Sequence, residues 1–329
     1  MRKTFMGLII AMLVLALAAC GGKKSSENAS EVKGSDYPTK QIELIVPYAA
    51  GGGTDSVARA FADAAKNHLS QPMGVVNKVG GGGAVGMTEG SSAKPDGYKV
   101  TLVTVEMVTL HNLGLAAFTP NDFTPVARLN ADPAAITVSA DAPWNTVDEF
   151  IEYAKQNPGK IRIGNSGSGA IWHLAALSLE EKTGAKFNHI PFEGAAPAVT
   201  ALLGGHIEAV TVSPGEVASQ VENGKLKILG VMSADRLEKY QDVPTLKENG
   251  IDLEIGTWRG LAVPKDTPQD VVDVLKETAQ KVTEEQSFQD VLSNMNLGLS
   301  YADNEEFQNQ INKEDESFKA IIDKLGLKK

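Results

Sequence analysis

The chain has 329 residues and a formal net charge of −10 at pH 7, from 31 Lys and Arg against 41 Asp and Glu. An acidic chain without a run of Lys or Arg lacks the basic footprint that binds phosphate backbones, so we expect no nucleic-acid partner. The single cysteine excludes an internal disulfide, and the 42% hydrophobic content is ordinary for a globular protein. Because single hydrophobic cores stop growing at about 250–300 residues, the length favours two domains.

The start of the chain has the order of an export signal. Two basic residues precede an apolar run over 5–19 that is too short to span a bilayer comfortably, and small residues lead to Cys20. This order resembles a bacterial lipoprotein signal, which implies removal of residues 1–19 and lipid attachment to Cys20. An ordinary signal peptide with an incidental cysteine is the alternative. Residues 20–36 are small, polar and charged and predict a flexible tether. We therefore expect an extracytoplasmic, membrane-anchored lipoprotein, on the outer face of the cell membrane or in the periplasm.

From residue 37 onward, short apolar and β-branched runs alternate with helical patterns. The expected strands are 42–46, 74–79, 99–105, 136–138, 161–164, 187–190, 209–212 and 228–232. The expected helices are 54–69, 146–157, 170–183, 195–203, 217–223, 268–283 and 304–325. This rhythm predicts an α/β fold in which two parallel-rich sheets are flanked by helices.

Two glycine-rich turns follow successive predicted strands. The first, over 47–55, leads into a helix, and the second covers 80–86. Glycine permits positive φ and close backbone approach, and a helix N-terminus adds unpaired N–H groups with a partial positive charge. Together these features predict an anion site that needs no lysine. The alternative is a pair of tight surface turns in which Thr54 and Asp55 only cap a helix.

Three enzyme interpretations fit the sequence less well. Gly81, Gly83 and Gly86 satisfy G-x-G-x-x-G and Glu106 lies 20 residues further on, but the pattern is weak inside a glycine run and an exported protein has little dinucleotide to bind. The segment 164–168 fails the G-x-S-x-G pattern of a nucleophile elbow. The five histidines never stand at metal-ligand spacing. We therefore expect no catalytic residue, no cofactor and no metal.

An ordered series of short motifs extends over 37–325. The pieces are Pro47 with Gly51-Gly52-Gly53-Thr54-Asp55 and Arg59, Asn77 with Gly80–Gly86, Lys94-Pro95-Asp96-Gly97-Tyr98, Gly164 with Gly167, Gly169 and His173-Leu174-Ala175, His189-Ile190-Pro191-Phe192 with Gly194 and Pro197, Leu202-Leu203-Gly204-Gly205, and Val243-Pro244-Thr245 with Trp258 and Gly260. The series resembles the substrate-binding receptors of tripartite tricarboxylate transporters, the Bug-type receptors. The resemblance implies a two-lobed periplasmic-binding-protein fold of type II. It also implies a cleft that binds a small carboxylate, mainly through backbone amides of the two glycine loops and bridging waters, and membrane permease subunits as partners. The chain departs from the family at Tyr48-Ala49-Ala50, at Ala170 and at Ala201.

On this basis we predict one lobe from 37–138 plus 259–329 and another from 139–258, with a hinge where the chain crosses near Ser139 and Trp258. We expect a monomer. The predicted ligand-binding residues are Tyr48, Ala49, Ala50, Gly51, Gly52, Thr54, Asp55, Gly81, Gly82, Ala84, Asn165, Ser166, Gly169, Phe192 and Ser213. Valine at Gly52 or Gly82 is expected to abolish binding, because a β-branched side chain disfavours positive φ and fills the space through which a ligand approaches the backbone. The alternatives are an exported α/β hydrolase-like enzyme, which would need a nucleophile–base pair, and a scaffold lipoprotein that does not take part in transport.

Overall fold

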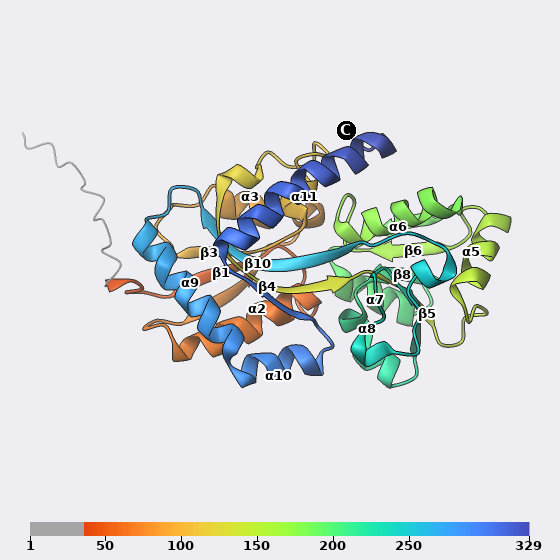
Figure 1. The fold of residues 1–329 in the computed structure, drawn as a ribbon, viewed down its shortest axis with the longest axis horizontal. Helices are drawn as coiled ribbons and strands as arrows, with labels where there is room; N and C mark the ends of the chain where they lie inside the picture. Colours follow the sequence, from red (N-terminus) through yellow and green to blue (C-terminus); the bar gives the residue numbers. More distant parts are fainter. Residues whose placement is uncertain (1–35, 329) are drawn as a thin grey trace, which may run out of the picture. The chain divides into compact units, whose positions relative to one another are not determined.

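The computed structural model describes residues 36–328 (Figure 1). The predicted signal peptide, Cys20 and nearly all of the predicted tether lie outside the described residues. Within the described part, no helix is both long enough and apolar enough to cross a membrane.

The first sheet has six strands in the order β11-β4-β10-β3-β1-β2. Their bounds are β1 Ile42–Val46, β2 Met73–Asn77, β3 Lys99–Thr104, β4 Phe123–Pro133, β10 Gly256–Pro264 and β11 Leu299–Ala302. Strand β1 pairs in parallel with β2 and β3, whereas β10 runs antiparallel to β3 and β4, and β11 antiparallel to β4. The apolar run of β1 is buried except at Glu43, as expected for a central strand covered on both faces.

The second sheet has five strands in the order β7-β6-β8-β5-β9. Their bounds are β5 Ala135–Ser139, β6 Arg162–Asn165, β7 Asn188–Pro191, β8 Ala209–Val212 and β9 Leu226–Val231. Strand β6 pairs in parallel with β7 and β8, and β5 runs antiparallel to β8 and β9.

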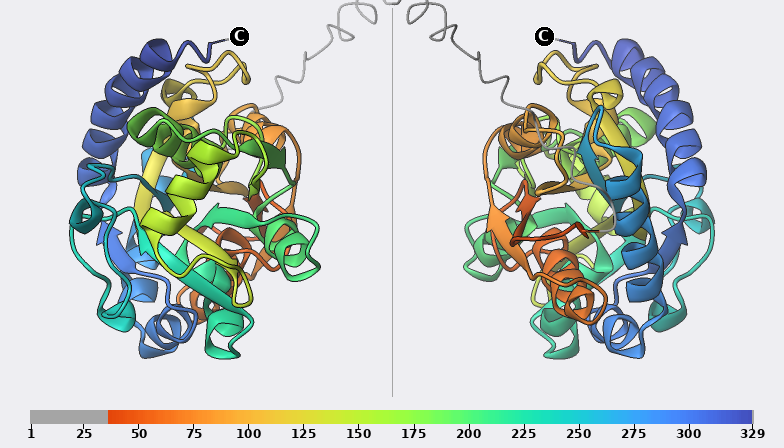
Figure 2. Two further views of the ribbon diagram at one scale, coloured as in Figure 1. Left: turned by 90° about the vertical axis from the view of Figure 1, so that its right-hand side faces the viewer. Right: turned by 90° about the vertical axis from the view of Figure 1, so that its left-hand side faces the viewer.

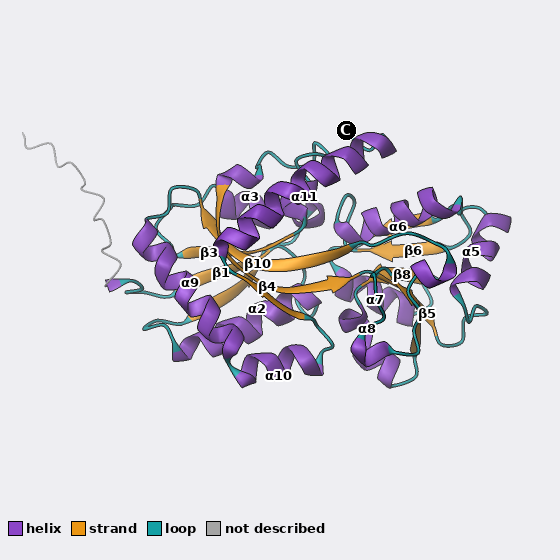
Figure 3. Ribbon diagram, viewed as in Figure 1, coloured by secondary structure: helices purple, strands orange, loops and turns teal. Residues whose placement is uncertain are grey.

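Helices cover both sheets (Figure 3). The helices of the first sheet are α2 Gly53–Ala64, α3 Ala84–Ser91, α4 Glu106–Thr109, α9 Gln269–Glu284, α10 Gln286–Asn294 and α11 Asn304–Leu325. The helices of the second sheet are α5 Val147–Gln156, α6 Ile171–Thr183, α7 Ala195–Leu203 and α8 Pro214–Glu222. Short 3₁₀ turns are η2 Ala65–Asn67, η3 Gly81–Gly83, η4 Pro120–Asp122, η5 Glu238–Tyr240 and η6 Lys247–Asn249. Helix α11, dark blue in Figure 2, lies along β4 and beside α4.

The expected α/β class with two helix-flanked sheets is confirmed, but the sheets are mixed instead of parallel-rich. The difference comes from three strands that run opposite to the other strands of their sheets: β10 and β11 in the first sheet and β5 in the second. Strand β4 was missed in the sequence because Pro125, Arg128, Asn130 and Asp132 interrupt its apolar pattern. Strands β10 and β11 and helices α3, α4 and α10 were also not predicted.

Two long strands carry the chain between the sheets. Strand β4 leaves the first sheet at Pro133 and β5 starts the second at Ala135, while the start of β10 at Gly256 pairs with Pro133 (Figure 1). The lobe boundaries at 138/139 and 258/259 stay a prediction. Trp258 is buried, and its Nε1–H donates to Glu314 of α11 at 2.6 Å.

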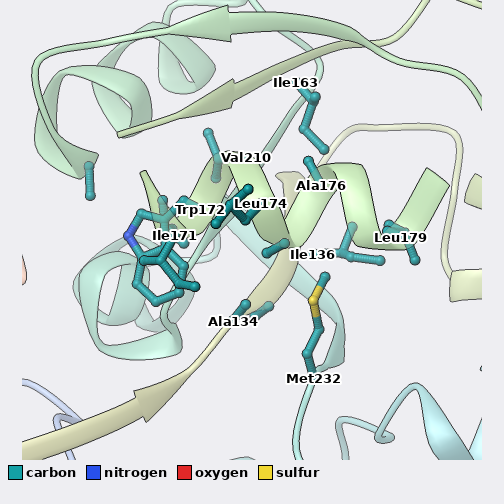
Figure 4. Close-up of a cluster of buried hydrophobic side chains, with 14 of the residues drawn as sticks. Ala134, Ile136, Ile163, Ile171, Trp172, Leu174, Ala176, Leu179, Val210 and Met232 are labelled. Carbon is teal, nitrogen blue, oxygen red and sulfur yellow. The ribbon is translucent and has the colours of Figure 1, made fainter. Parts of the chain in front are cut away.

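The core of the second sheet places the start of α6. The side chains of Ile171, Trp172 and Leu174 on α6 gather with those of Ala134 and Ile136 on and beside β5 (Figure 4). Because these side chains are buried, the N-terminal end of α6 is held firmly where β6 ends.

Candidate functional site

The first glycine loop is organised by one buried carboxylate. The Asp55 side chain accepts from the Gly51 N–H at 2.9 Å, from Arg59 Nε at 2.8 Å and from Asn77 Nδ2 at 2.9 Å. Burial by itself would raise the pKa of Asp55, but these hydrogen bonds to the ionised form hold the pKa below its ordinary value. Arg59 is half exposed whereas Asp55 is buried, so the pair is a loop anchor and not only a surface ion pair.

The second glycine loop depends on backbone conformation. Gly80, Gly81, Gly82 and Gly83 all have positive φ, from +61° to +134°. The Gly83 N–H donates to the Gly80 carbonyl at 3.2 Å and the Tyr48 hydroxyl donates to the Gly82 carbonyl at 3.3 Å. Positive φ is therefore required here, as predicted at Gly82.

The same argument was wrong at Gly52. Its φ is −84°, a value that any residue adopts, and a Cβ there would meet the Ala196 nitrogen and the Ala49 carbonyl oxygen at an ordinary 3.8 Å. Only Gly51 in the first loop has positive φ.

Loops from the two sheets are in direct contact. The Ala49 N–H donates to the Glu193 carbonyl at 3.0 Å. A Cβ on Gly167, in the β6–α6 loop, would lie 2.7 Å from the Gly82 Cα. Both glycine loops thus touch the second sheet's loops.

Beside these contacts is a cavity of about 20 Å³, room for roughly one water molecule. Residues of both sheets line it: Tyr48, Ala49, Gly52, Gly53, Thr54, Thr104, Glu106, Trp172, Ala195, Glu216, Thr257 and Arg259. The cavity includes the amino end of α2, where backbone N–H groups have no helical partner.

The buried guanidinium of Arg259 connects residues of the first sheet's part of the chain with Glu216 at the start of α8. Arg259 donates from Nε to Thr54 Oγ1 at 3.0 Å, from Nη1 to Asp132, and from Nη2 to Glu216 Oε1 at 3.4 Å. Glu216 also accepts from the Gly53 N–H at 3.3 Å. Burial raises the pKa of Glu216 more than the charge of Arg259 lowers it.

A second buried carboxylate, Glu106, also connects the two sheets. Glu106 follows β3, and its Oε1 accepts from the Ile171 N–H at the start of α6 at 2.7 Å, while Oε2 accepts from the Thr104 hydroxyl. The Tyr48 hydroxyl lies 3.1 Å from Thr104 Oγ1. Burial first, and then the Glu106 charge, raises the pKa of Tyr48 well above its ordinary range.

Four predicted residues, Tyr48, Ala49, Gly52 and Thr54, line the cavity. The other predicted residues lie in or beside the touching loops and do not line it: Ala50, Gly51, Asp55, Gly81, Gly82, Ala84, Asn165, Ser166, Gly169, Phe192 and Ser213. Of these, Ala50, Gly51 and Gly81 are exposed. The Ser213 hydroxyl, expected to contact ligand, is instead hydrogen-bonded to Glu216 in a capping box at the start of α8.

Two predicted residues, Asn165 at the end of β6 and Ser166 in the loop that follows, have polar atoms without a partner in the described chain. The Gly167 N–H donates to Asn165 Oδ1 at 3.0 Å, which fixes the orientation of the amide and leaves Nδ2 as a buried, unpaired donor. The Ser166 Oγ is also buried and unpaired. Buried polar atoms are normally hydrogen-bonded, so both atoms have free hydrogen-bonding capacity.

Most of the charged and aromatic residues that line the cavity are not among the predicted ligand-binding residues. Glu106, Glu216 and Arg259 were not predicted, nor were Thr104 and Trp172. A signal existed for two of them, because Glu106 interrupts an apolar run over 100–108 and Arg259 stands in an apolar strand. A charge buried in such a run is costly unless it is paired.

The fold defines a class: a two-lobed periplasmic binding protein built on two helix-flanked α/β sheets. The sequence model of the tripartite tricarboxylate transporter family receptor matches residues 57–327. The chain belongs to this family, and it is a solute-binding receptor, not an enzyme.

Several known proteins are similar over most of their length. A UPF0065 protein from Cupriavidus necator is 33% identical over 98% of this chain and 96% of its own. Among solved structures, periplasmic binding protein BugD has 32% identity and a TM-score of 0.85, covering 89% of this chain and 99% of its own. A solute binding protein from Polaromonas, with no ligand, has 54% identity and a TM-score of 0.66, covering 88% of this chain and 99% of its own. A Rhodopseudomonas palustris protein with adipate has 25% identity and a TM-score of 0.84, covering 88% of this chain and 99% of its own.

Proposed function

We propose that this receptor captures a small carboxylate between the loops of its two sheets and delivers it to the membrane permease subunits of a tripartite tricarboxylate-type transporter. The observation that carries the proposal is the pair of buried, unpaired groups, Asn165 Nδ2 and Ser166 Oγ. An amide N–H can only donate and a hydroxyl can donate, so together they suit an acceptor such as a carboxylate. The adipate bound by the R. palustris relative agrees with this chemistry.

Binding of this ligand requires the two lobes to separate first. The cavity between the touching loops is smaller than any dicarboxylate, so a ligand must enter an open form. A hinge on β4 and β10 would produce such a difference between structures: the ligand-free Polaromonas structure has a TM-score of 0.66 at 54% identity, against 0.85 at 32% identity for BugD. Small-angle scattering should show compaction when a binding carboxylate is added, and identical curves would contradict the hinge.

A carboxylate panel tests the proposed ligand class. A carboxylate present at 100 times its Kd adds about 2.7 kcal/mol to the free energy of unfolding, which a thermal-shift screen detects. For the best acid, Ser166→Ala should weaken binding by about 0.5–3 kcal/mol in calorimetry. Thr137→Val, which removes another buried, unpaired hydroxyl in the middle of β5, should leave affinity unchanged. If no member of the panel binds, the carboxylate proposal is wrong.

We also propose that the mature protein is lipid-anchored through Cys20. The support is the sequence order around this residue, which lies outside the described residues. Cys20→Ser should release the protein from the membrane fraction or block its processing. An intact mass that shows an unmodified N-terminus beyond Cys20 would contradict the anchor.

A further inference from the structure

The cavity has more negative charge than a site for a simple acid should have. Glu106 and Glu216 line it from opposite sheets, and Asp132 lies directly behind Arg259. Among the described residues that line the cavity, Arg259 is the only cation. Its guanidinium is already paired with both Asp132 and Glu216, so it carries no surplus charge for a ligand carboxylate.

Glu106 lacks a counter-ion within the described chain. Glu106 is 1% exposed, and its partners are all neutral donors: the Ile171 N–H, the Thr104 hydroxyl and the Tyr48 hydroxyl. The amino end of α6 supplies a partial positive charge but not a full one. A carboxylate has about four acceptor positions, so Glu106 can accept further hydrogen bonds.

We infer that the ligand carries an ammonium group as well as a carboxylate, and that Glu106 binds the ammonium group. The inference rests on the proposed function, because it adds a cationic group to the proposed acid. An ammonium group beside Glu106 would supply the missing counter-ion, whereas an acid without one would add negative charge to a cavity that already has an excess.

The remaining lining residues suit such an ion. Tyr48 and Trp172 line the same cavity, and aromatic faces attract an ammonium group. The unpaired donors of Asn165 and Ser166 lie at the end of β6 and the start of the loop that leads into α6, whose first N–H binds Glu106. One compact molecule with both charges, an amino-carboxylic acid, matches this arrangement.

Matched pairs of probes test the inference on the full chain. Glutamate and glutarate, aspartate and succinate, and alanine and propionate have the same carbon skeletons with and without the amino group. In at least one pair, the amino member should bind the wild-type protein at least tenfold more tightly in calorimetry. If the amine-free members bind as well or better, the ammonium inference is wrong and the carboxylate proposal stands. If neither member of any pair binds, the carboxylate proposal fails with it.

A charge-neutral variant assigns the effect to one residue. Glu106→Gln keeps an oxygen for the Ile171 N–H and should lower the affinity for the amino member at least tenfold, while the amine-free member binds as before or more tightly. Glu152→Gln, an exposed residue on α5, removes the same charge elsewhere and should change neither affinity. An equal loss of both members in Glu106→Gln would mean that Glu106 only holds the lobes together, and would overturn its role as the ammonium ligand.

Discussion

The two glycine-rich loops look alike in the sequence but are held in place by different means. The first is fixed by charged side chains: Asp55 accepts from Gly51, Glu216 accepts from Gly53, and Arg259 donates to Thr54. The second is fixed by its own backbone, with positive φ at every residue over 80–83. A glycine run therefore does not predict by itself whether glycine is needed for conformation or for space.

Space is the reason at Gly53. A Cβ there would lie 2.7 Å from Arg259 Nη2 and 3.0 Å from the Glu216 side chain. The first loop thus needs glycine where the charged network comes close, and the second needs it where the backbone turns.

The largest effect is expected from removal of the cation that holds the first loop. Arg259→Met leaves Asp132 and Glu216 buried without their counter-ion and should lower the free energy of unfolding by about 3–5 kcal/mol, measured by urea denaturation. Arg162→Met is the control, because its pair with Glu208 is exposed to solvent and its loss should lower the free energy of unfolding far less. Equal losses in the two variants would contradict this account of the first loop.

Gly82 in the second loop should respond to a single added methyl group, whereas Gly52 in the first loop should not. Gly82→Ala forces a Cβ into positive φ at 3.2 Å from the Ser168 carbonyl oxygen, and should cost about 1–2 kcal/mol of stability. Gly52→Ala should be neutral or stabilise by up to about 1 kcal/mol, since its φ suits alanine. Gly82→Asn should restore part of the loss, because asparagine tolerates this conformation. Similar stabilities of the two alanine variants would show that the loops do not differ.

Asp55 should give the first loop a pH dependence. Since the pKa of Asp55 lies below its ordinary value of 3.8 in the folded state, its ionised form stabilises the fold above that pH, and this contribution is lost as pH falls through the folded-state pKa. Asp55→Asn should cost about 1–3 kcal/mol at pH 7, because the new amide N–H faces other donors. The difference from wild type should shrink in urea titrations below about pH 3.8. A difference that is constant with pH would contradict the role of the charge.

The smallest effect is expected at the residue that connects the loops. Tyr48→Phe removes the hydroxyl that contacts Gly82 and Thr104 and should cost about 0.5–1.5 kcal/mol. Both variants are compared by thermal unfolding, in which Tyr153→Phe, on the exposed side of α5, should leave the stability almost unchanged.

Much of this molecule could be predicted from local sequence. The helix over 195–203 and the strand over 209–212 lie where the apolar pattern places them. Both glycine loops and the β6–α6 loop were also selected, because glycine and strand ends mark such sites locally. Tyr48 and Thr54 followed from their places in the first loop.

The charged interior was decided only by tertiary structure. Strand β4 was not visible in the sequence because its polar residues Asn130 and Asp132 make sense only with Arg259, which is more than 120 residues away. Glu106 likewise acquires its role from Ile171, 65 residues further on. The local sequence shows that a charged residue stands in an apolar run, but the partner that makes its burial possible comes from another part of the chain.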